Sequence, residues 1–280
     1  MKRGTCAAFG GFDGVHIGHR AVVEKVIQVS AERGLEPVLV IFETKEGERF
    51  LTTREEKRFL LERYPLKDVL FLPRRETDED FVREVLSEEL GVKAVVMGGC
   101  HPELNFFRQT GSQIGFDVVE CETVTGEDGL PVDAGGICRA LTENRLEAAE
   151  RLLGHPYVVM GEVVTGKQLG RTVGQPTANI DFPQSKVLPP DGSYITVTLV
   201  DGQRRVGLTN IGKRPTVDNY DYTTIENHIL DFSGNLYGKV LVLEVLRFIR
   251  GVEKFDSLAA VKRQIDRDIV TLREYIASVK

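Results

Sequence analysis

The apolar residues of this chain change their spacing near Tyr157, and that change constrains the fold more than any other feature. Before it, short apolar runs alternate with longer stretches whose apolar residues recur every three or four positions, as in helices with one buried face. After it, apolar and polar residues alternate and turn signals separate the runs, which is typical of antiparallel strands. The sequence therefore predicts two cores of different class, an α/β domain over residues 1–153 and an all-β domain over residues 154–280.

The first half predicts a parallel sheet covered by helices, because strand-sized apolar runs alternate with helix-length amphipathic stretches. The expected strands are Thr5–Phe9, Pro37–Phe42, Asp68–Leu72, Lys93–Met97 and Phe116–Glu120. The expected helices are Arg20–Arg33, Arg54–Arg63, Asp78–Leu90 and Ile137–Leu153. Gly154 and Pro156 follow the last helix at positions that commonly end one.

The second half predicts a small antiparallel barrel or sandwich followed by one helix. An apolar run at 197–200 leads into Asp201-Gly202, a strong two-residue hairpin signal. Alternating segments at 225–230 and 239–246 supply further strands. Apolar residues at three- or four-residue spacing then predict a C-terminal amphipathic helix from Leu258 to Ile276.

Composition and charge exclude several classes of function. The formal net charge of −6 argues against general nucleic-acid binding, which depends on clustered Lys and Arg. The apolar runs are far too short to span a membrane, and Gly10, Gly11 and Asp13 interrupt the one near the basic start, so we expect no signal peptide and a cytoplasmic protein. The four cysteines form no Cys-x-x-Cys pair, which indicates reduced thiols rather than a zinc site.

A glycine-rich segment lies early in the second half. Gly161 to Lys167 nearly matches a phosphate-binding P-loop, but Gln168 stands where Ser or Thr is required and no helix follows, so that interpretation is rejected. Arg171 would still neutralise phosphate charge. Three glycines would let the backbone approach a phosphate and present its amides, namely Gly166, Gly170 and Gly174.

Pro176 stiffens the chain just before Thr177 and Asn179, whose side chains point to the same side of an extended segment. Two neutral hard oxygens at that spacing suit Mg²⁺, which takes few protein ligands together with water and substrate phosphates. The alternative is a plain Gly/Pro loop in which Thr177 and Asn179 cap a turn.

Several strings of the second half follow one another in a recognisable order. They are Gly161 to Asn179 with its Pro-Thr-Ala-Asn end, Asn210-Ile-Gly-x-x-Pro215-Thr216, Glu226-x-His228-x-Leu230-Asp231-Phe232, Leu236-Tyr-Gly238, Arg250 and Lys254-Phe255. In this order they resemble the riboflavin kinase family. The resemblance implies a six-stranded antiparallel barrel with a C-terminal helix, which transfers the γ-phosphate of ATP to the ribityl 5′-hydroxyl of riboflavin.

The same resemblance implies roles for individual residues. Thr177 and Asn179 would hold Mg²⁺, Glu226 would accept the proton of the riboflavin hydroxyl, and Arg250 would contact the flavin. The nucleotide would lie against Gly161, Gly166, Gly170, Arg171, Gly174 and Pro176. Glu226 suits a base because it stands beside apolar Ile225 in an alternating strand, where partial burial favours proton uptake. The alternative is an ordinary surface glutamate of a strand.

A second motif, Phe9-Gly-Gly-Phe-Asp-Gly-Val-His16-Ile-Gly-His19, lies between the first expected strand and the first expected helix. Such a position in an α/β sheet binds phosphates, because backbone amides and the helix dipole converge there. His16 and His19 would both face one anion. The alternatives are a metal pair, for which the sequence has no third ligand nearby, and two solvated histidines.

This motif resembles the His-x-Gly-His nucleotidyltransferases, and in this context the FAD synthetase module that bacteria fuse to riboflavin kinase. Residues 52–61 and 81–96 resemble that module too. The resemblance implies a Rossmann-like nucleotidyltransferase domain in which FMN attacks the α-phosphorus of ATP and pyrophosphate leaves. His16 and His19 would stabilise the triphosphate, and further nucleotide-binding positions would be Phe9, Gly11, Asp13, Gly18 and Arg139.

Three segments depart from that module. Glu43 to Glu46 replaces a Pro-His-Pro element, and Gly99 to Pro102 replaces a Gly-x-Asp-Phe-x-Phe-Gly element. Ala134 to Arg139 replaces a Ser-Ser-Thr-x-Ile-Arg signature, of which only Arg139 and the helix position remain. We therefore expect a riboflavin kinase with FMN adenylyltransferase attached. The alternatives are a monofunctional riboflavin kinase with a degenerate N-terminal domain, and a flavin- or nucleotide-binding regulatory protein.

Overall fold

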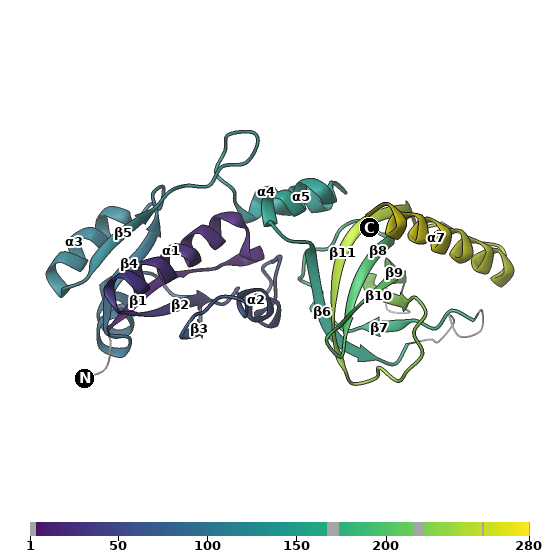
Figure 1. Cartoon of the computed structure of the whole chain (residues 1–280), viewed down its shortest axis with the longest axis horizontal. Coiled ribbons are helices and arrows are strands. Elements are labelled where there is room, and N and C mark those ends of the chain that lie inside the picture. Colours follow the sequence, from purple (N-terminus) through teal and green to yellow (C-terminus); the bar gives the residue numbers. More distant parts are fainter. Residues whose placement is uncertain (1–3, 167–173, 216–220, 254, 280) are drawn as a thin grey trace. The chain divides into compact units, whose positions relative to one another are not determined.

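The structure, a computed structural model, describes residues 4–166, 174–215, 221–253 and 255–279 (Figure 1). Its internal contacts divide the chain into two compact units, Met1–Gly136 with Leu152–Gly154, and Ile137–Arg151 with His155–Lys280. Residues 137–151 thus group with the second unit. The domain boundary between residues 153 and 154 stays a prediction.

The first unit contains a five-stranded parallel sheet in the order β3-β2-β1-β4-β5. The strands are β1 (Thr5–Gly10), β2 (Glu36–Phe42), β3 (Asp68–Leu72), β4 (Val92–Gly98) and β5 (Asp117–Cys121). Each expected strand is confirmed to within one residue at either end. β1 lies in the middle of the sheet, so the motif that follows it begins at the carboxyl edge of the central strand.

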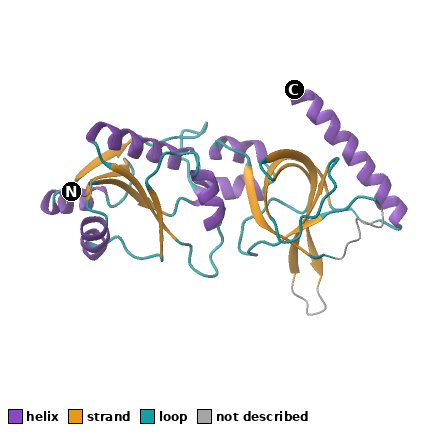
Figure 2. Ribbon diagram, turned by 60° about the horizontal axis from the view of Figure 1, so that its bottom comes forward, coloured by secondary structure: helices purple, strands orange, loops and turns teal. Residues whose placement is uncertain are grey.

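Helices cover both faces of this sheet (Figure 2). The helical segments are η1 (Asp13–Val15), α1 (Ile17–Arg33), α2 (Arg54–Leu61), η2 (Phe81–Glu89) and α3 (Leu104–Ile114). Cys6 of β1 lies beside Ser30 of α1, whereas its neighbour Ala7 packs in one apolar cluster with Phe81 and Phe107. Because successive strand residues face opposite sides, α1 covers one face, while η2 and α3 cover the other.

Three helical features differ from the sequence prediction. The segment expected as a helix at 78–90 is a π-type helix, η2, and α3 was not expected. The single helix expected at Ile137–Leu153 is wrong, because the chain forms α4 (Ala134–Thr142) and α5 (Leu146–Leu153) instead. Asn144 between them has φ 58°, a left-handed conformation that a continuous α-helix does not contain.

The second unit contains a closed barrel of six antiparallel strands in the order β10-β7-β6-β11-β8-β9, followed by helix α7 (Leu258–Val279). The strands are β6 (Tyr157–Val164), β7 (Ala178–Ile180), β8 (Gly192–Val200), β9 (Gln203–Pro215), β10 (Asp221–Ile229) and β11 (Val240–Gly251). The barrel with its terminal helix confirms the fold that the resemblance implied. None of the helices in the described ranges is long and apolar enough to cross a membrane.

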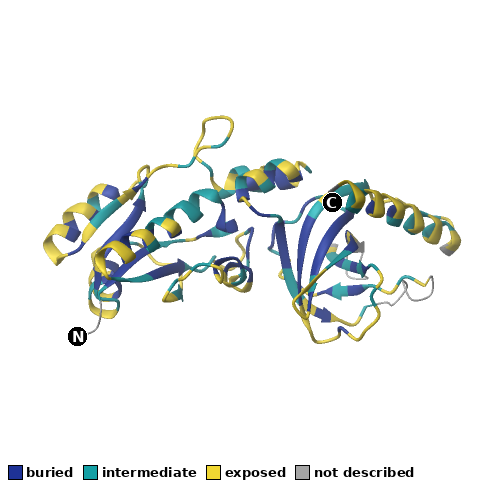
Figure 3. Ribbon diagram, viewed as in Figure 1, coloured by how far each residue is buried: buried dark blue, intermediate teal, exposed yellow. Residues whose placement is uncertain are grey.

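The barrel strands contain many buried residues (Figure 3). These include polar as well as apolar side chains. The hydroxyls of Thr196 and Thr209 lie 2.8 Å apart, and Asn227 accepts from Thr209 at 3.3 Å while donating to Thr198 at 2.6 Å. Buried polar groups of this kind are hydrogen-bonded because an unmet donor or acceptor costs about 1–3 kcal/mol. On another side of the same strands, Leu272 of α7 packs with buried apolar residues of β8 and β9.

Candidate active sites

The loop between β1 and α1 is a tight turn with several left-handed backbone conformations. Phe12 has φ 45°, Gly14 has φ 80° and Val15 has φ 44°. A Cβ on Gly14 would lie only 3.0 Å from a methyl of Leu51, so this position requires glycine for both conformation and space. The turn ends at His16, which has an extended backbone and whose side chain caps the N-terminus of α1.

Asp13 and Thr52 hold this turn against the segment before α2. The Asp13 carboxylate accepts from the backbone amides of Leu51 at 2.9 Å and Thr52 at 2.8 Å, and from the Thr52 hydroxyl at 3.0 Å. The same hydroxyl accepts from the amide of Gly14 at 2.8 Å. Asp13, predicted to bind nucleotide, therefore also fixes the shape of the loop that carries the two histidines.

The structure brings His16 and His19 together, as predicted. The two rings stack with centroids 3.6 Å apart, and His16 Nδ1 accepts from the amide of His19 at 3.3 Å. Burial holds the pKa of His19 well below its usual value, and the positive charges of His16 and Lys57 lower it further. His19 is therefore neutral near pH 7. Its Nδ1 is buried and has no hydrogen-bond partner among the described residues.

A cavity of about 420 Å³ lies beside this turn, with Phe9, Gly11 and Asp13 among its lining residues. Three of the predicted nucleotide-binding residues thus share one cavity. A Cβ on Gly18 would lie 3.1 Å from the His16 ring, so glycine leaves room for that imidazole. Arg139 is exposed on α4, in the part of the chain that groups with the second unit, and its role in nucleotide binding stays a prediction.

His101 lines the same cavity and was not predicted as a site residue. Its Nδ1 accepts from the amide of Glu103 at 3.2 Å, and burial lowers its pKa, so the neutral ring carries its proton on Nε2 as a hydrogen-bond donor. Its ring lies edge-on to that of Phe9, with centroids 6.2 Å apart. The sequence could have indicated His101 by its position just after β4, because ligands of parallel sheets bind beyond the carboxyl ends of the strands.

The barrel places Thr177, Asn179 and Glu226 together, although they come from separate segments. The Thr177 hydroxyl donates to Glu226 Oε2 at 3.4 Å. Glu226 of β10 stands directly opposite Asn179 of β7 and Asn210 of β9 in the strand register. Directly opposite residues of antiparallel strands project on the same side, so one carboxylate and two amides share one surface. Asn210 was not predicted as a site residue, because only the register reveals its position.

The predicted nucleotide-binding glycines of the second unit have different structural roles. A Cβ on Gly166 would overlap the side-chain amide of Asn179, so this glycine packs against a predicted metal ligand. A Cβ on Gly161 would overlap the backbone of Asp181, so Gly161 is required where β6 and the segment after β7 approach closely. Gly174 is an exposed residue with φ 77°. Gly170 and Arg171 lie outside the described residues.

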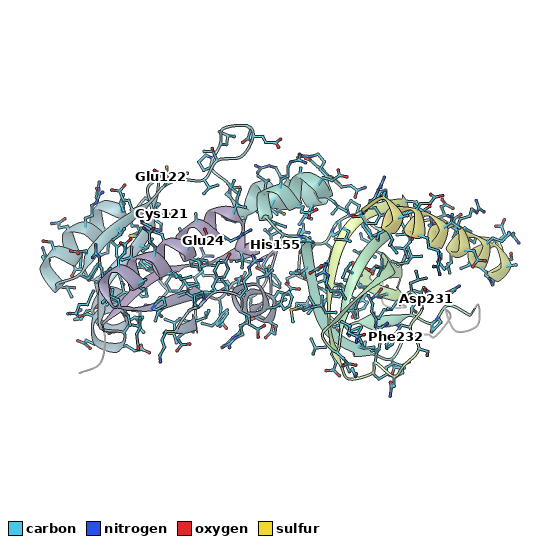
Figure 4. The ribbon with its side chains drawn as sticks, viewed as in Figure 1. Glu24, Cys121, Glu122, His155, Asp231 and Phe232 are labelled. Atoms are coloured by element: carbon cyan, nitrogen blue, oxygen red, sulfur yellow. The ribbon has the colours of Figure 1, made fainter. Side chains whose placement is uncertain are left out.

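A cavity of about 490 Å³ opens beside Thr177 and Pro176. His228 Nδ1 lies 2.9 Å from the carbonyl oxygen of Pro176, which holds this edge of the cavity to β10. The rest of the lining is mainly apolar and aromatic, with Phe232 in the loop after β10 (Figure 4), and includes Val163, Ile229, Leu236 and Tyr237. An apolar pocket of this size with a few polar groups at one edge is typical of a small-molecule site.

Arg250 has a partner within the second unit. Its guanidinium donates to both carboxylate oxygens of Asp268 on α7, from Nε at 3.1 Å and from Nη2 at 2.8 Å. Asp268 is buried, so this pair ties the end of β11 to the C-terminal helix. The contact between Arg250 and a flavin stays a prediction.

The donor set at Glu226 suits a hard divalent cation. Within the described residues, no group of three or more His, Cys, Asp or Glu side chains could hold a metal ion. Thr177 and Asn179, the predicted ligands, instead offer one hydroxyl and one amide oxygen, and the Glu226 carboxylate lies beside them. Mg²⁺ keeps most of its waters and binds few protein oxygens together with phosphates, so these residues fit it.

Comparison with known proteins decides the family. A family model described as riboflavin kinase matches residues 153–276, and one described as FAD synthetase matches residues 1–129. The bifunctional riboflavin kinase/FMN adenylyltransferase of Escherichia coli strain K12 is 32% identical over 300 residues, covering 100% of this chain and 95% of that protein. The chain belongs to this bifunctional family.

Other relatives agree in length and fold. The bifunctional riboflavin kinase/FMN adenylyltransferase of Pseudomonas fluorescens is 34% identical, covering 98% of this chain and 94% of that protein. A solved structure described as a macrolide-efflux protein from Streptococcus pneumoniae superposes with a TM-score of 0.83 at 23% identity, covering 98% of this chain and 95% of that one. This second likeness shows that the two chains share a fold.

The segments that depart from the bifunctional family's usual motifs still contribute to the first site. Glu43, Thr44 and His101 come from two of them and line the cavity that also contains Gly11 and Asp13. In the third, the amide of Gly136 donates to Asp133 at 2.6 Å at the start of α4. The departures in the first two segments therefore change the side chains around a cavity that is still present.

Proposed function

We propose that the barrel unit phosphorylates riboflavin to FMN and that the sheet unit adenylates FMN to FAD, both with ATP. The observation that carries the first activity is the hydrogen bond from Thr177 to Glu226, with Asn179 opposite, at the edge of a 490 Å³ cavity. The match of residues 153–276 to the riboflavin kinase model supports the same reaction. The stacked rings of His16 and His19, and the 420 Å³ cavity lined by Phe9, Gly11 and Asp13 of the same turn, support the second activity.

In the kinase reaction, Glu226 would accept the proton of the ribityl 5′-hydroxyl as that oxygen bonds to the γ-phosphorus. The bond between the γ-phosphorus and the bridging oxygen breaks, and ADP leaves with the electron pair. Thr177 and Asn179 would hold Mg²⁺, which when bound neutralises the charge of the β- and γ-phosphates. Such a reaction depends mainly on positioning and charge, and the Thr177 hydroxyl orients the Glu226 carboxylate.

The apolar lining of the 490 Å³ cavity would receive the adenosine part of ATP, with the phosphates directed toward Thr177. Tyr237 and Phe232 offer aromatic surface there. The apolar lining would hold the adenine ring, and Thr177 lies at the polar edge of the cavity. The orientation of ATP would therefore depend on the whole lining rather than on a single charged contact.

In the adenylyl transfer, a phosphate oxygen of FMN would bond to the α-phosphorus of ATP. The bond from that phosphorus to the β-phosphate oxygen breaks, and pyrophosphate leaves with the electron pair. His16 orients His19 through the ring stack, and the neutral His19 ring would donate a hydrogen bond to the polyphosphate. His101 Nε2 supplies a second donor at the cavity wall.

Incubation of the full chain with riboflavin, ATP and Mg²⁺, followed by chromatography of the flavins, tests both steps. We expect FMN to appear first and FAD to follow, and we expect FMN supplied directly to give FAD and pyrophosphate. A chain that makes FMN but no FAD from either start would instead be a monofunctional kinase, the candidate that the three departing segments favour. A chain that makes no FMN would contradict the kinase assignment. The cytoplasmic location remains a prediction.

A further inference from the structure

His228 is a half-buried residue of β10 to which the two proposed reactions assign no role. It lies two positions after Glu226, and alternate residues of a strand face the same side, so both side chains project from one face of β10. The ring Nδ1 of His228 lies 2.9 Å from the carbonyl oxygen of Pro176. A carbonyl oxygen can only accept, so Nδ1 carries a proton and donates it to Pro176.

The two predicted metal ligands differ in how the barrel holds them. Asn179 is the middle residue of β7 and pairs with Glu226 in the strand register. Thr177 precedes β7, whose pairing with β10 covers residues 178–180. If that register continued by one residue, Thr177 would stand opposite His228. The position of Thr177 therefore depends on contacts other than the β7 ladder.

Two side-chain contacts tie this segment to β10. The Thr177 hydroxyl donates to Glu226 Oε2 at 3.4 Å, which is long for a hydrogen bond between two oxygens. The bond from His228 to Pro176, at 2.9 Å, has an ordinary length and is the stronger of the two contacts. Because the peptide group is planar, holding the carbonyl of Pro176 also fixes the amide of Thr177. His228 therefore orients the residue that carries the predicted hydroxyl ligand.

We propose that His228 is a positioning residue, which holds the peptide between Pro176 and Thr177 against β10. This keeps the Thr177 hydroxyl beside Asn179, where the two side chains would hold Mg²⁺. The inference rests on the proposed function of the barrel unit. His228 acts through Pro176 and needs no contact with the metal or the substrates. Its loss frees the segment that carries Thr177, so Mg²⁺ should tighten nucleotide binding less.

The competing explanation is that Nε2 of the His228 ring contacts a phosphate or the flavin directly. Two amide replacements separate the explanations. In His228→Asn the amide nitrogen is attached to Cγ, as Nδ1 is in histidine, so the bond to Pro176 can be kept. In His228→Gln the amide nitrogen lies one atom further out, as Nε2 does. Positioning predicts that Asn replaces His228 better than Gln does, and direct contact predicts the reverse.

The test compares the wild-type full chain with His228→Asn, His228→Gln and His228→Leu. Thr224→Val is the matched control, because the Thr224 hydroxyl lies on the same face of β10 but donates to the carbonyl of Gly212 on β9, at 3.2 Å. Calorimetric titration with ADP, in Mg²⁺ and in a chelator, measures without turnover how much Mg²⁺ tightens binding. The Mg²⁺ concentration for half-maximal riboflavin phosphorylation and the thermal unfolding curve are measured on the same samples. Any ADP binding by the first unit is common to all five chains, so only differences between them are interpreted.

In His228→Gln and His228→Leu, the factor by which Mg²⁺ tightens ADP binding should fall about 3- to 10-fold, the loss expected for one hydrogen bond. The Mg²⁺ concentration for half-maximal phosphorylation should rise by a similar factor. His228→Asn should stay within about twofold of wild type, because it keeps the donor to Pro176. Thr224→Val should match wild type in both measurements.

Three results would overturn the proposal. They are wild-type Mg²⁺ tightening in a folded His228→Leu chain, an equal loss in the Asn and Leu variants, and a smaller loss in Gln than in Asn. If the Leu variant does not fold, the comparison of Asn with Gln decides. Absence of FMN formation by the wild type would instead refute the proposed phosphorylation and leave the ADP comparison valid.

Discussion

The two candidate sites are built in opposite ways. The site of the first unit is local, since Phe9 to His19 is one continuous turn whose shape is set by left-handed backbone and by Asp13. The site of the barrel is composite, since Thr177 and Asn179 meet Glu226 only through the pairing of β7 with β10. A local site is sensitive to backbone conformation, whereas a composite site depends on strand register.

The two sites also differ in their electrostatics. At the histidine turn, burial lowers the pKa of His19, and its Nδ1 has no hydrogen-bond partner among the described residues. In the barrel, Thr177 already donates to Glu226, so the acidic group is partly satisfied. The first site is therefore expected to gain most of its stabilisation on binding, and the second to be largely arranged beforehand.

The largest expected effect separates the two sites by chemistry. Glu226→Gln removes the proposed base, and the kcat of riboflavin phosphorylation should fall about 10²- to 10⁴-fold. FAD formation from supplied FMN should be unchanged. Glu162→Gln, an exposed glutamate on β6, is the matched control. Steady-state assays of both reactions check the result, and unchanged phosphorylation by Glu226→Gln would refute the assigned base.

A smaller effect tests how tightly the composite site is packed. In Gly166→Ala the new methyl overlaps the side-chain amide of Asn179, so the amide must move. A shift of about 1 Å can cost about 10²-fold, and we expect kcat/KM for riboflavin phosphorylation to fall about 10- to 100-fold, with a higher Mg²⁺ requirement. Gly251→Ala, where the methyl meets nothing within 4 Å, should behave as wild type. Wild-type Mg²⁺ dependence in Gly166→Ala would contradict Asn179 as a ligand.

The smallest expected effect concerns the stability of the local site. Because the pKa of His19 is lowered in the folded chain, the unfolded chain binds more protons below about pH 6.5, and His19 makes folding less favourable as the pH falls below that value. Above that pH it has no such effect. Between pH 6.5 and 5, the free energy of unfolding should therefore fall less in His19→Ala than in the wild type. The difference in slope should reach at most about 1.4 kcal/mol per pH unit. Urea unfolding at several pH values measures this, and parallel curves for the two proteins would show that His19 titrates normally.

The sequence predicts the local site better than the composite one for a physical reason. His16 and His19 are three positions apart at the start of a helix, so their proximity follows from local geometry. His101 lines the cavity of this site from the segment after β4, and no spacing in the sequence records that position.

In the barrel, alternation predicts which way a strand residue faces, but not what stands beside it. Alternation placed Glu226 next to buried Ile225, yet the neighbourhood of Asn210 depends on the register of β9. Similarly, apolar spacing continues across Asn144, so the break between α4 and α5 could not be read from periodicity. The roles of Thr177 and Asn179 came from family resemblance rather than from spacing.

The central claim is that the two reactions take place at two separate sites, and that the site with His19 works without the Glu226 carboxylate and the reverse. Mixing Glu226→Gln chains with His19→Ala chains tests it most directly, with riboflavin, ATP and Mg²⁺ supplied and FAD measured by chromatography. Each variant alone should make little FAD, because the first makes no FMN and the second cannot adenylate it. The mixture should restore FAD formation, since FMN made by one chain can be adenylated by the other. A mixture that accumulates FMN without FAD would show that the two sites do not work independently and would contradict the account.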